Sequence, residues 1–309
     1  MRILVIGAGA TGGYFGGRLL ESGQDVTFLV REGRAAQLAT HGLVIRSSLG
    51  NATLANPATV QTGGLRETFD LILLSCKAYH LPQVIEDMSA AVGPDTMIVP
   101  LLNGMRHLDV LDERFGAERV LGGQCVIAAT LDKQGVVHHL NQSHSLTFGE
   151  RDGSRSERVE RVLAAMSQVK FEPRLSTTIL QDMWDKWVFL ASLAGITCLM
   201  RAPVGDIVAA TGGEAATLQL LEDCWRVAAL NRHAPSDAVL ARACGVLTEK
   251  GSKLSASMMR DLEQGGQIEA DHVMGDMLAR AGEEAESLTL LRTAYAHLKA
   301  YEVRRDGRA

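Results

Sequence analysis

Apolar and polar positions in the first half of the chain alternate between strand-like runs and helical segments. An apolar run at residues 2–6 leads directly into a glycine-rich segment, and a helical pattern follows until Ser22-Gly23. Further strand-like runs, most of them followed by helical segments, occupy residues 25–30, 69–77, 96–101 and 120–129. Continuous apolar runs are typical of strands buried on both faces, so this alternation predicts an α/β fold with a Rossmann-type, doubly wound parallel sheet.

Two stretches depart from this alternation. Residues 38–57 hold two short β-like runs, at 43–45 and 52–54, with Gly42 and Gly50-Asn51 as turn signals, which predicts a hairpin. Residues 135–149 hold two more, which we expect to form a hairpin that closes the domain. His138, His139 and His144 lie there, but adjacent strand residues face opposite sides, and no cysteine or carboxylate cluster accompanies them. We therefore expect structural or surface histidines and no metal site.

Helical periodicity dominates the second half of the chain. Helical patterns cover residues 157–169, 178–200, 214–231, 237–253, 270–280 and 287–304. Pro173 marks the expected boundary between a nucleotide-binding domain, residues 1–175, and an all-helical substrate domain, residues 176–309. The most apolar stretch, Trp187 to Met200, is shorter than the ~20 residues that span a bilayer, so we expect a buried helix.

The glycine-rich segment Gly7-Ala8-Gly9-Ala10-Thr11-Gly12 has the spacing of a dinucleotide-binding loop. Gly7 would permit the tight turn, Gly9 the close approach of a pyrophosphate, and Gly12 the packing of helix on strand. The helix that follows offers unpaired N–H groups to phosphates. A glycine-rich turn that binds nothing is the alternative, and the strand before and helix after the loop argue against it.

The residue after the second strand predicts which dinucleotide binds. An NAD-type site would place a carboxylate there, whereas this chain has Arg31, with Arg34 just beyond. A guanidinium matches a 2′-phosphate by bidentate hydrogen bonding, which predicts NADP(H) bound through Arg31. Two alternatives stay open: Glu32 could bind a ribose hydroxyl, or residues 31–34 could be a solvated charged turn.

Composition excludes several partners. A chain of 309 residues suits two domains. Its net charge is −5, with basic and acidic residues mixed along the chain, so the sequence shows no basic region of the kind that binds nucleic acid or an anionic membrane. The five cysteines form no CxxC pair and lie in apolar stretches, so we expect reduced core residues. Because Met1 leads straight into a strand, we expect no signal peptide and a cytoplasmic protein.

A nucleotide domain followed by a helical domain suggests an oxidoreductase whose substrate binds between the two. The first catalytic candidate is Lys186, which lies between tryptophans on an otherwise apolar helix. A structural ion pair with Asp182, four residues earlier, is the alternative for this lysine.

With these residues the chain resembles the ketopantoate reductase (2-dehydropantoate 2-reductase) family almost end to end. The motifs occur in the family's order: the loop Gly7 to Gly12 with Arg31 after the second strand, Cys76-Lys77-Ala78-Tyr79, Asn103-Gly104-Met105, the helix with Lys186, Ser257-Met258-Met259-Arg260-Asp261, and Glu269-Ala270-Asp271 with Gly275.

The resemblance implies reduction of a 2-oxo acid to the 2-hydroxy acid with NADPH, by default of ketopantoate to pantoate in pantothenate biosynthesis. Lys186 would be the general acid, and Glu269 would hydrogen-bond the reacting oxygen and hold Lys186. Ser257 would bind the substrate, Asn103 would lie beside the nicotinamide and the substrate, and Lys77 would contact cofactor phosphate or ribose. A helix cap for Ser257 and a solvated charge for Glu269 are the alternatives.

Three departures from the family put the substrate in question. Leu190, Ala194 and Leu254 stand where pantoate-forming relatives have substrate-binding asparagines. Apolar groups there would leave polar substrate atoms without partners, which favours a more apolar carbonyl or imine substrate as the alternative. A dinucleotide-binding regulator without turnover is a lesser alternative. The expected partners are the small-molecule substrate and, in a homodimer, a second copy of the chain.

Overall fold

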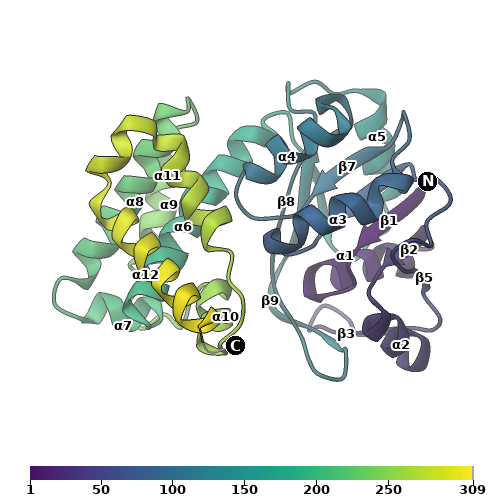
Figure 1. Cartoon of the computed structure of the whole chain (residues 1–309), viewed down its shortest axis with the longest axis horizontal. Coiled ribbons are helices and arrows are strands. Elements are labelled where there is room, and N and C mark those ends of the chain that lie inside the picture. Colours follow the sequence, from purple (N-terminus) through teal and green to yellow (C-terminus); the bar gives the residue numbers. More distant parts are fainter. Residues whose placement is uncertain (308–309) are drawn as a thin grey trace. The chain divides into compact units, whose positions relative to one another are not determined.

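The chain forms two compact units in this computed structural model, which describes residues 1–307. One unit comprises Met1–Leu102 and His107–Leu180, and the other comprises Asn103–Arg106 and Gln181–Ala309. Residues 308 and 309 of the expected helical domain lie outside the described residues. Figure 1 colours the sheets of the first unit purple to teal and most helices of the second green to yellow.

The first unit contains the expected parallel sheet. Its strand order is β5-β2-β1-β6-β7, and every neighbouring pair is parallel, which confirms the Rossmann-type fold. Ile6 is level with Leu29 and Leu74, and Leu74 is level with Pro100, so the strands end at one edge of the sheet. The strands are β1 (Arg2–Ile6), β2 (Asp25–Leu29), β5 (Ala58–Val60), β6 (Leu71–Leu74) and β7 (Met97–Pro100).

A second sheet has the order β10-β9-β3-β4, and β8 also pairs with β9. Its strands are β3 (Leu43–Arg46), β4 (Ala52–Leu54), β8 (Gly122–Leu131), β9 (Val137–Gly149) and β10 (Glu172–Leu175). The antiparallel pair β3–β4 confirms the hairpin predicted within residues 38–57. Strand β8, expected to extend the parallel sheet, instead runs antiparallel to β9 in this second sheet.

The hairpin predicted within residues 135–149 is wrong, because β9 is one strand of 13 residues. The polar residues Asn141 to Ser143 interrupt the apolar pattern, but they are an exposed stretch of the same strand. The turn lies earlier, between β8 and β9, where the Asp132 carboxylate accepts hydrogen bonds from the backbone N–H groups of Gln134 and Val136 at 3.0 and 2.8 Å. Pro173, expected at a domain boundary, lies in the edge strand β10, where a missing N–H is tolerated.

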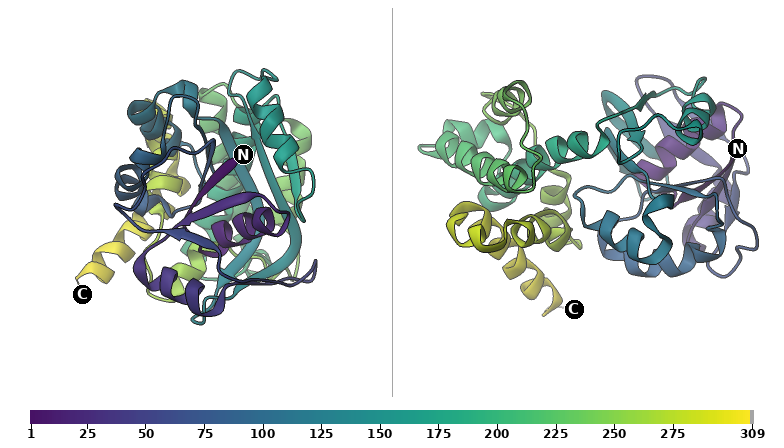
Figure 2. Two further views of the ribbon diagram at one scale, coloured as in Figure 1. Left: turned by 90° about the vertical axis from the view of Figure 1, so that its right-hand side faces the viewer. Right: turned by 90° about the horizontal axis from the view of Figure 1, so that it is seen from above.

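Helix α1 (Ala10–Glu21) packs against both sheets, and Figure 2 shows it as the purple helix beside the strands. A Cβ on Gly16 would lie 2.6 Å from the ring of Phe28 in the parallel sheet. A Cβ on Gly17 would lie 2.8 Å from Ile45 in the second sheet. Because these two glycines lack side chains, both sheets can pack closely against α1. This packing keeps the start of α1 next to the carboxyl end of β1.

The remaining helices of the first unit lie between these strands along the chain. Helix α2 was not expected, because its only buried side chain is Leu38 and its apolar signal is weak. The elements are α2 (Glu32–His41), η1 (Ala78–His80), α3 (Leu81–Met88), η2 (Ser89–Ala91), α4 (Arg106–Phe115), η3 (Ala117–Arg119) and α5 (Glu157–Ala165).

The second unit is helical, as expected. Its longest helix, α6 (Ile179–Met200), has 22 residues and is long and apolar enough to cross a membrane. The stretch Trp187 to Met200, expected to be too short to span a bilayer, is part of this longer helix, so its length alone does not exclude a span. The expected buried helix is confirmed, because 67% of the helix's most apolar window is buried within the protein. The other elements are α7 (Val204–Ala209), α8 (Gly213–Leu230), α9 (Asp237–Leu247), α10 (Ser257–Glu263), η4 (Asp271–Gly275), α11 (Asp276–Ala281), η5 (Gly282–Ser287) and α12 (Thr289–Asp306).

Candidate active site

The glycine-rich loop joins β1 to α1 at the carboxyl edge of the parallel sheet. Gly7 has a φ of +86°, which a side chain would strain, and its N–H donates to the Leu29 carbonyl at 2.9 Å. A Cβ on Gly12 would lie only 2.1 Å from the Gly7 carbonyl oxygen. These two glycines are therefore required by the protein's own packing.

Gly9 differs, because an added Cβ would have no heavy atom of those compared within 4 Å. Gly9 is exposed, and it precedes Ala10 and Thr11, the first residues of α1, without a side-chain cap. The N–H groups of a helix's first turn and its positive dipole end favour phosphate at such a position. The open space at Gly9 and this uncapped helix start fit a dinucleotide pyrophosphate.

The two arginines near β2 have different surroundings. Arg31 is exposed and directly precedes α2, whereas Arg34 is half-buried. Arg34 donates from Nε to the Ala8 carbonyl at 2.8 Å and from a terminal nitrogen to the Gly135 carbonyl at 2.9 Å. Arg34 therefore supports the glycine-rich loop, a role that its position in the sequence did not indicate, while Arg31 remains exposed at the start of α2.

Lys77 lies on the other side of the loop, three residues after β6. It is half-buried, and its carbonyl accepts from the His80 N–H at 2.9 Å. Burial and, to a smaller extent, the charge of Arg31 lower the pKa of His80. The segments that carry Arg31 and Lys77 thus flank the glycine-rich loop at one edge of the sheet.

In the second unit, a π-helical turn, η4, connects two of the predicted catalytic segments. The Trp187 indole N–H, adjacent to Lys186 on α6, donates to the Val273 carbonyl of η4 at 2.9 Å. The Val273 N–H donates in turn to the Glu269 carbonyl at 3.0 Å. Lys186 and Glu269 are both half-buried. Two residues far apart in sequence are therefore carried by backbone segments that are hydrogen-bonded to one turn, and π-helical turns often occur at functional sites.

Asn103 and Gly104 lie against the same turn. Gly104 has a φ of +79°, and a Cβ there would lie 2.9 Å from the His272 carbonyl oxygen. The His272 imidazole, which is buried, hydrogen-bonds the Asn103 backbone. Asn103 follows β7 by three residues, yet it belongs to the second unit. The sequence did not single out His272.

Ser257 belongs to helix α10, whose start is hydrogen-bonded to α6. It is exposed at the first position of α10, and the preceding residue, Ala256, donates its N–H to the Thr197 hydroxyl of α6 at 3.4 Å. Thr197 is eleven residues after Lys186, which is about 16 Å along a helix. Leu190, half-buried, and Ala194, buried, share the helix face between them. The segment before Ser257 is thus bonded to α6 beyond Leu190 and Ala194, counted from Lys186.

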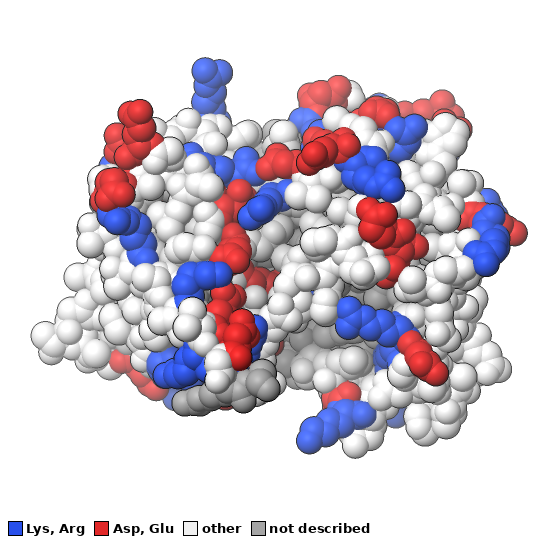
Figure 3. All heavy atoms as spheres, viewed as in Figure 1, with Lys and Arg blue, Asp and Glu red and all other residues white. Residues whose placement is uncertain are grey.

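Other features of the described residues do not add to this site. No group of three His, Cys, Asp or Glu side chains within residues 1–307 could hold a metal ion. Hollows of about 480 Å³, beside Asp25 and Pro57, and about 430 Å³, beside His144 and Lys170, lie elsewhere in the first unit. Of the five cysteines, Cys125, Cys198 and Cys224 are buried, and burial raises the thiol pKa of Cys198 and Cys224 to about 12. On the face shown in Figure 3, acidic and basic side chains are intermixed.

Comparisons with known proteins match both units. Residues 3–153 match the ketopantoate reductase PanE/ApbA model, and residues 178–302 match its C-terminal counterpart. The uncharacterized oxidoreductase YkpB of Bacillus subtilis is 40% identical over 98% of this chain and 99% of its own. The 2-dehydropantoate 2-reductase structure from Geobacter metallireducens is 26% identical, has a TM-score of 0.88, and covers 97% of this chain and 99% of its own.

A structure of D-mandelate dehydrogenase with NADH and anilino(oxo)acetate has the same fold, with a TM-score of 0.88 at 20% identity. It covers 99% of both chains. The fold is therefore one that these reductases share from end to end.

Proposed function

Because this chain belongs to the ketopantoate reductase family, we propose that it reduces a 2-oxo acid to the 2-hydroxy acid with NADPH. Ketopantoate is the first substrate to test. The observation that carries the proposal is the turn η4, to which the segments of Lys186, Glu269 and Asn103 are all attached. A protein that only bound a dinucleotide would have no need of these three groups beside one turn.

The cofactor would be held by the first unit. The loop Gly7 to Gly12 and the start of α1 would bind the pyrophosphate, Lys77 a phosphate or ribose, and Arg31 the 2′-phosphate. An exposed guanidinium beyond the second strand, in place of a carboxylate, supports NADPH over NADH. When bound, NADPH supplies the hydride that reduces the 2-oxo carbon.

Lys186 would supply the proton. Its ammonium group would donate to the carbonyl oxygen as that oxygen gains negative charge, and the neutral amine would then recover a proton from solvent. Glu269 would hydrogen-bond the same oxygen and hold Lys186, and Asn103 would orient the nicotinamide and the substrate. Ser257 would bind the far end of the substrate. General acid catalysis of this kind contributes roughly 10²- to 10⁴-fold to a rate.

Leu190 and Ala194 support a second candidate substrate, a 2-oxo acid with a larger apolar group. Both share the helix face between Lys186 and the Thr197 tether of α10, so the substrate's side chain would meet apolar atoms there. Another carbonyl or imine of similar shape fits the same argument. A buried polar substrate group without partners costs about 1–3 kcal/mol, which disfavours ketopantoate at this surface.

The test is a panel of 2-oxo acids with NADPH, comprising ketopantoate, pyruvate, 2-oxoisovalerate and benzoylformate. We expect NADPH-dependent turnover of at least one of these acids. In Lys186→Ala this turnover should fall at least 100-fold, while the affinity for NADPH stays nearly unchanged. Turnover of ketopantoate alone would show that Leu190 and Ala194 do not select an apolar substrate. NADPH binding without turnover of any acid would favour the non-catalytic regulator.

A further inference from the structure

We propose that His272 is a positioning residue, which holds the Asn103-Gly104 segment so that Asn103 can meet the nicotinamide end of the cofactor. The proposal rests on the proposed function, because it presupposes that NADPH binds. It concerns a residue to which neither the motifs nor the catalytic roles above assign a part.

The geometry around His272 carries this inference. The residue lies in η4, only 7% exposed, three positions after Glu269 and directly before Val273. Its backbone and its ring both pack on Gly104: a Cβ there would lie 2.9 Å from the His272 carbonyl oxygen and 3.3 Å from ring carbon Cδ2. A side chain at position 104 would therefore push His272 away from the Asn103-Gly104 segment.

A hydrogen bond fixes the contact. The imidazole hydrogen-bonds the Asn103 backbone, and this bond raises the pKa of the ring, which is the direction expected when a ring N–H donates to a backbone carbonyl. Burial acts in the opposite direction and dominates, so that the pKa of His272 is lowered. A largely neutral ring thus uses a donor to hold the backbone of the residue proposed to face the nicotinamide.

His272 lies in the same turn as Val273, which is hydrogen-bonded to the helix that carries Lys186. The Val273 carbonyl accepts a hydrogen bond from the Trp187 indole N–H, and Trp187 directly follows Lys186 in the sequence. One turn therefore bonds the side chain next to Lys186, the proposed proton donor, and, through His272, the backbone of Asn103. Holding such groups within a few tenths of an ångström of their working positions is what preorganised sites require. His272 would act on the reaction only through Asn103.

Two ligands separate a positioning role from a purely structural one. NADPH engages both ends of the proposed cofactor site, whereas adenosine 2′,5′-bisphosphate carries the 2′-phosphate but no nicotinamide. For His272→Phe, which removes the donor but keeps an aromatic ring, we expect NADPH to bind roughly tenfold more weakly with the bisphosphate unchanged. We also expect kcat to fall while KM for the 2-oxo acid changes little.

Two further variants complete the test. His272→Gln retains a side-chain N–H donor and should recover part of the loss in NADPH affinity and in kcat. Arg31→Ala is the matched control at the other end of the site, and it should weaken both ligands. Thermal unfolding of each variant identifies a loss of fold, and since His272→Gln keeps the polar contact it tests the proposal if the phenylalanine variant unfolds.

The results that overturn the proposal are distinct from those that overturn the function. If wild type turns over a 2-oxo acid but both His272 variants bind the two ligands as wild type does, the positioning role is wrong. Equal weakening of NADPH and bisphosphate in a folded His272→Phe also contradicts it. If wild type binds no NADPH and reduces no 2-oxo acid, the proposed function itself fails.

Discussion

The indole N–H of Trp187 donates a 2.9 Å hydrogen bond to the backbone carbonyl of Val273. Trp187 is 1% exposed, and its partner lies in a π-helical turn 86 residues later in the chain. This bond joins the helix that carries Lys186 to the turn that follows Glu269. Because the bond is buried, water cannot replace the donor when it is removed.

Trp187→Phe should therefore destabilise the protein by about 2 kcal/mol, since it leaves a buried carbonyl without its partner and opens a small cavity. Denaturant unfolding measures the change. Trp184→Phe is the matched control: Trp184 is 3% exposed and stacks on His233 at 5.6 Å, but it donates no hydrogen bond within the described residues. Equal losses in the two variants would show that the bond to Val273 adds nothing to stability.

The glycine-rich loop offers a contrast between two positions. Gly12→Ala should cost about 1–3 kcal/mol of stability, because its Cβ would lie 2.1 Å from the Gly7 carbonyl oxygen. Gly9→Ala should fold normally, because its Cβ enters open space. It should nevertheless bind NADPH more weakly, because the added methyl group would occupy space that the pyrophosphate needs. Thermal unfolding and NADPH titration of both variants check this. Normal NADPH affinity in Gly9→Ala would place the phosphates elsewhere.

Cofactor preference should depend on Arg31. Loss of charge-assisted hydrogen bonds to a 2′-phosphate costs about 1.5–3 kcal/mol, so kcat/KM with NADPH should fall roughly 10- to 100-fold in Arg31→Ala, and kcat/KM with NADH should change little. Arg34→Met is the control: it removes the bond to Ala8 that supports the loop and should weaken both cofactors alike. A wild-type preference for NADH would refute the role of Arg31.

The sequence predicted the parallel sheet because buried strands leave continuous apolar runs such as Leu71 to Leu74. The prediction of strands failed where exposed polar residues interrupt the apolar pattern within one continuous strand. In β9 the exposed residues Asn141 to Ser143 resemble a turn, but they lie within one strand, at the point where its register with β8 shifts between Ile127 and Ala129. Likewise Pro173 resembles a linker residue until the sheet edge at β10 is known. Such outcomes depend on tertiary pairing.

The candidate site shows the same limits. Positions such as Gly12 and Arg31 were predictable because they occupy fixed places after a strand. The contact of Arg34 with Ala8 and that of His272 with Asn103 join segments distant in the chain, and no local pattern reports them. The support around a site is thus harder to predict from one sequence than the residues that bind ligand.

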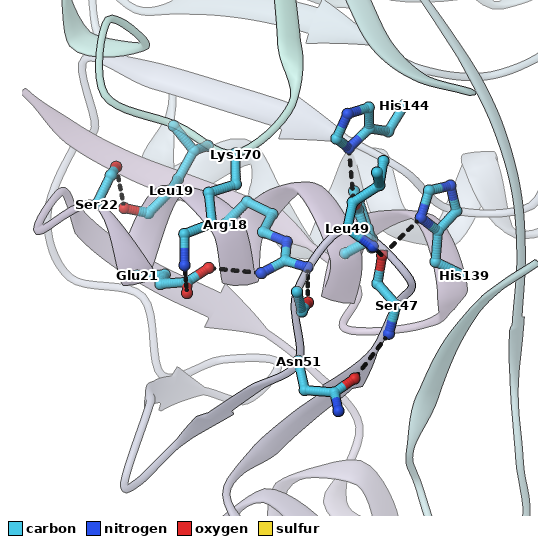
Figure 4. Close-up of polar contacts among 12 residues, drawn as sticks. Arg18, Leu19, Glu21, Ser22, Ser47, Leu49, Asn51, His139, His144 and Lys170 are labelled. Carbon is cyan, nitrogen blue, oxygen red and sulfur yellow. Dashed lines mark hydrogen bonds and ion pairs between the residues drawn. The ribbon is translucent and has the colours of Figure 1, made fainter. Parts of the chain in front are cut away.

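A buried polar cluster beside α1, shown in Figure 4, makes stability sensitive to pH. The Tyr14 hydroxyl and the His144 Nδ1 are 2.7 Å apart, and the His144 ring stacks on His139 at 5.6 Å. Arg18, fully buried on the same helix, lies 5.1 Å from the centre of the Tyr14 ring. Burial first, and then the charges of His139 and Arg18, lower the pKa of His144, while Glu172 opposes them.

Because the folded pKa of His144 lies below its ordinary value of 6.5, protonation favours the unfolded chain. The contribution is complete above pH 6.5 and is lost as the pH falls from there through the folded pKa. We expect Tm to decline on acidification from pH 7.5 to 5.5, and to decline less in His144→Gln, which keeps an acceptor for Tyr14. Parallel declines in the two proteins would exclude His144 as a source of the acid sensitivity.

The apolar face of α6 should determine the substrate. Leu190→Asn with Ala194→Asn introduces amides four and eight residues after Lys186, where the family resemblance implies substrate-binding asparagines. Each hydrogen bond to a neutral or charged substrate group adds about 0.5–3 kcal/mol, so kcat/KM for ketopantoate should rise roughly 10- to 100-fold, while that for 2-oxo acids with large apolar groups should fall.

Leu190→Gln alone is a useful comparison, because it adds an amide of different reach at the same position. The proposed apolar selectivity predicts that the double variant exchanges one substrate preference for the other, with Lys186 still required in both proteins. If the double variant leaves the ranking of the 2-oxo acids unchanged, then this helix face does not contact the substrate, and selection must come from residues outside Leu190 and Ala194.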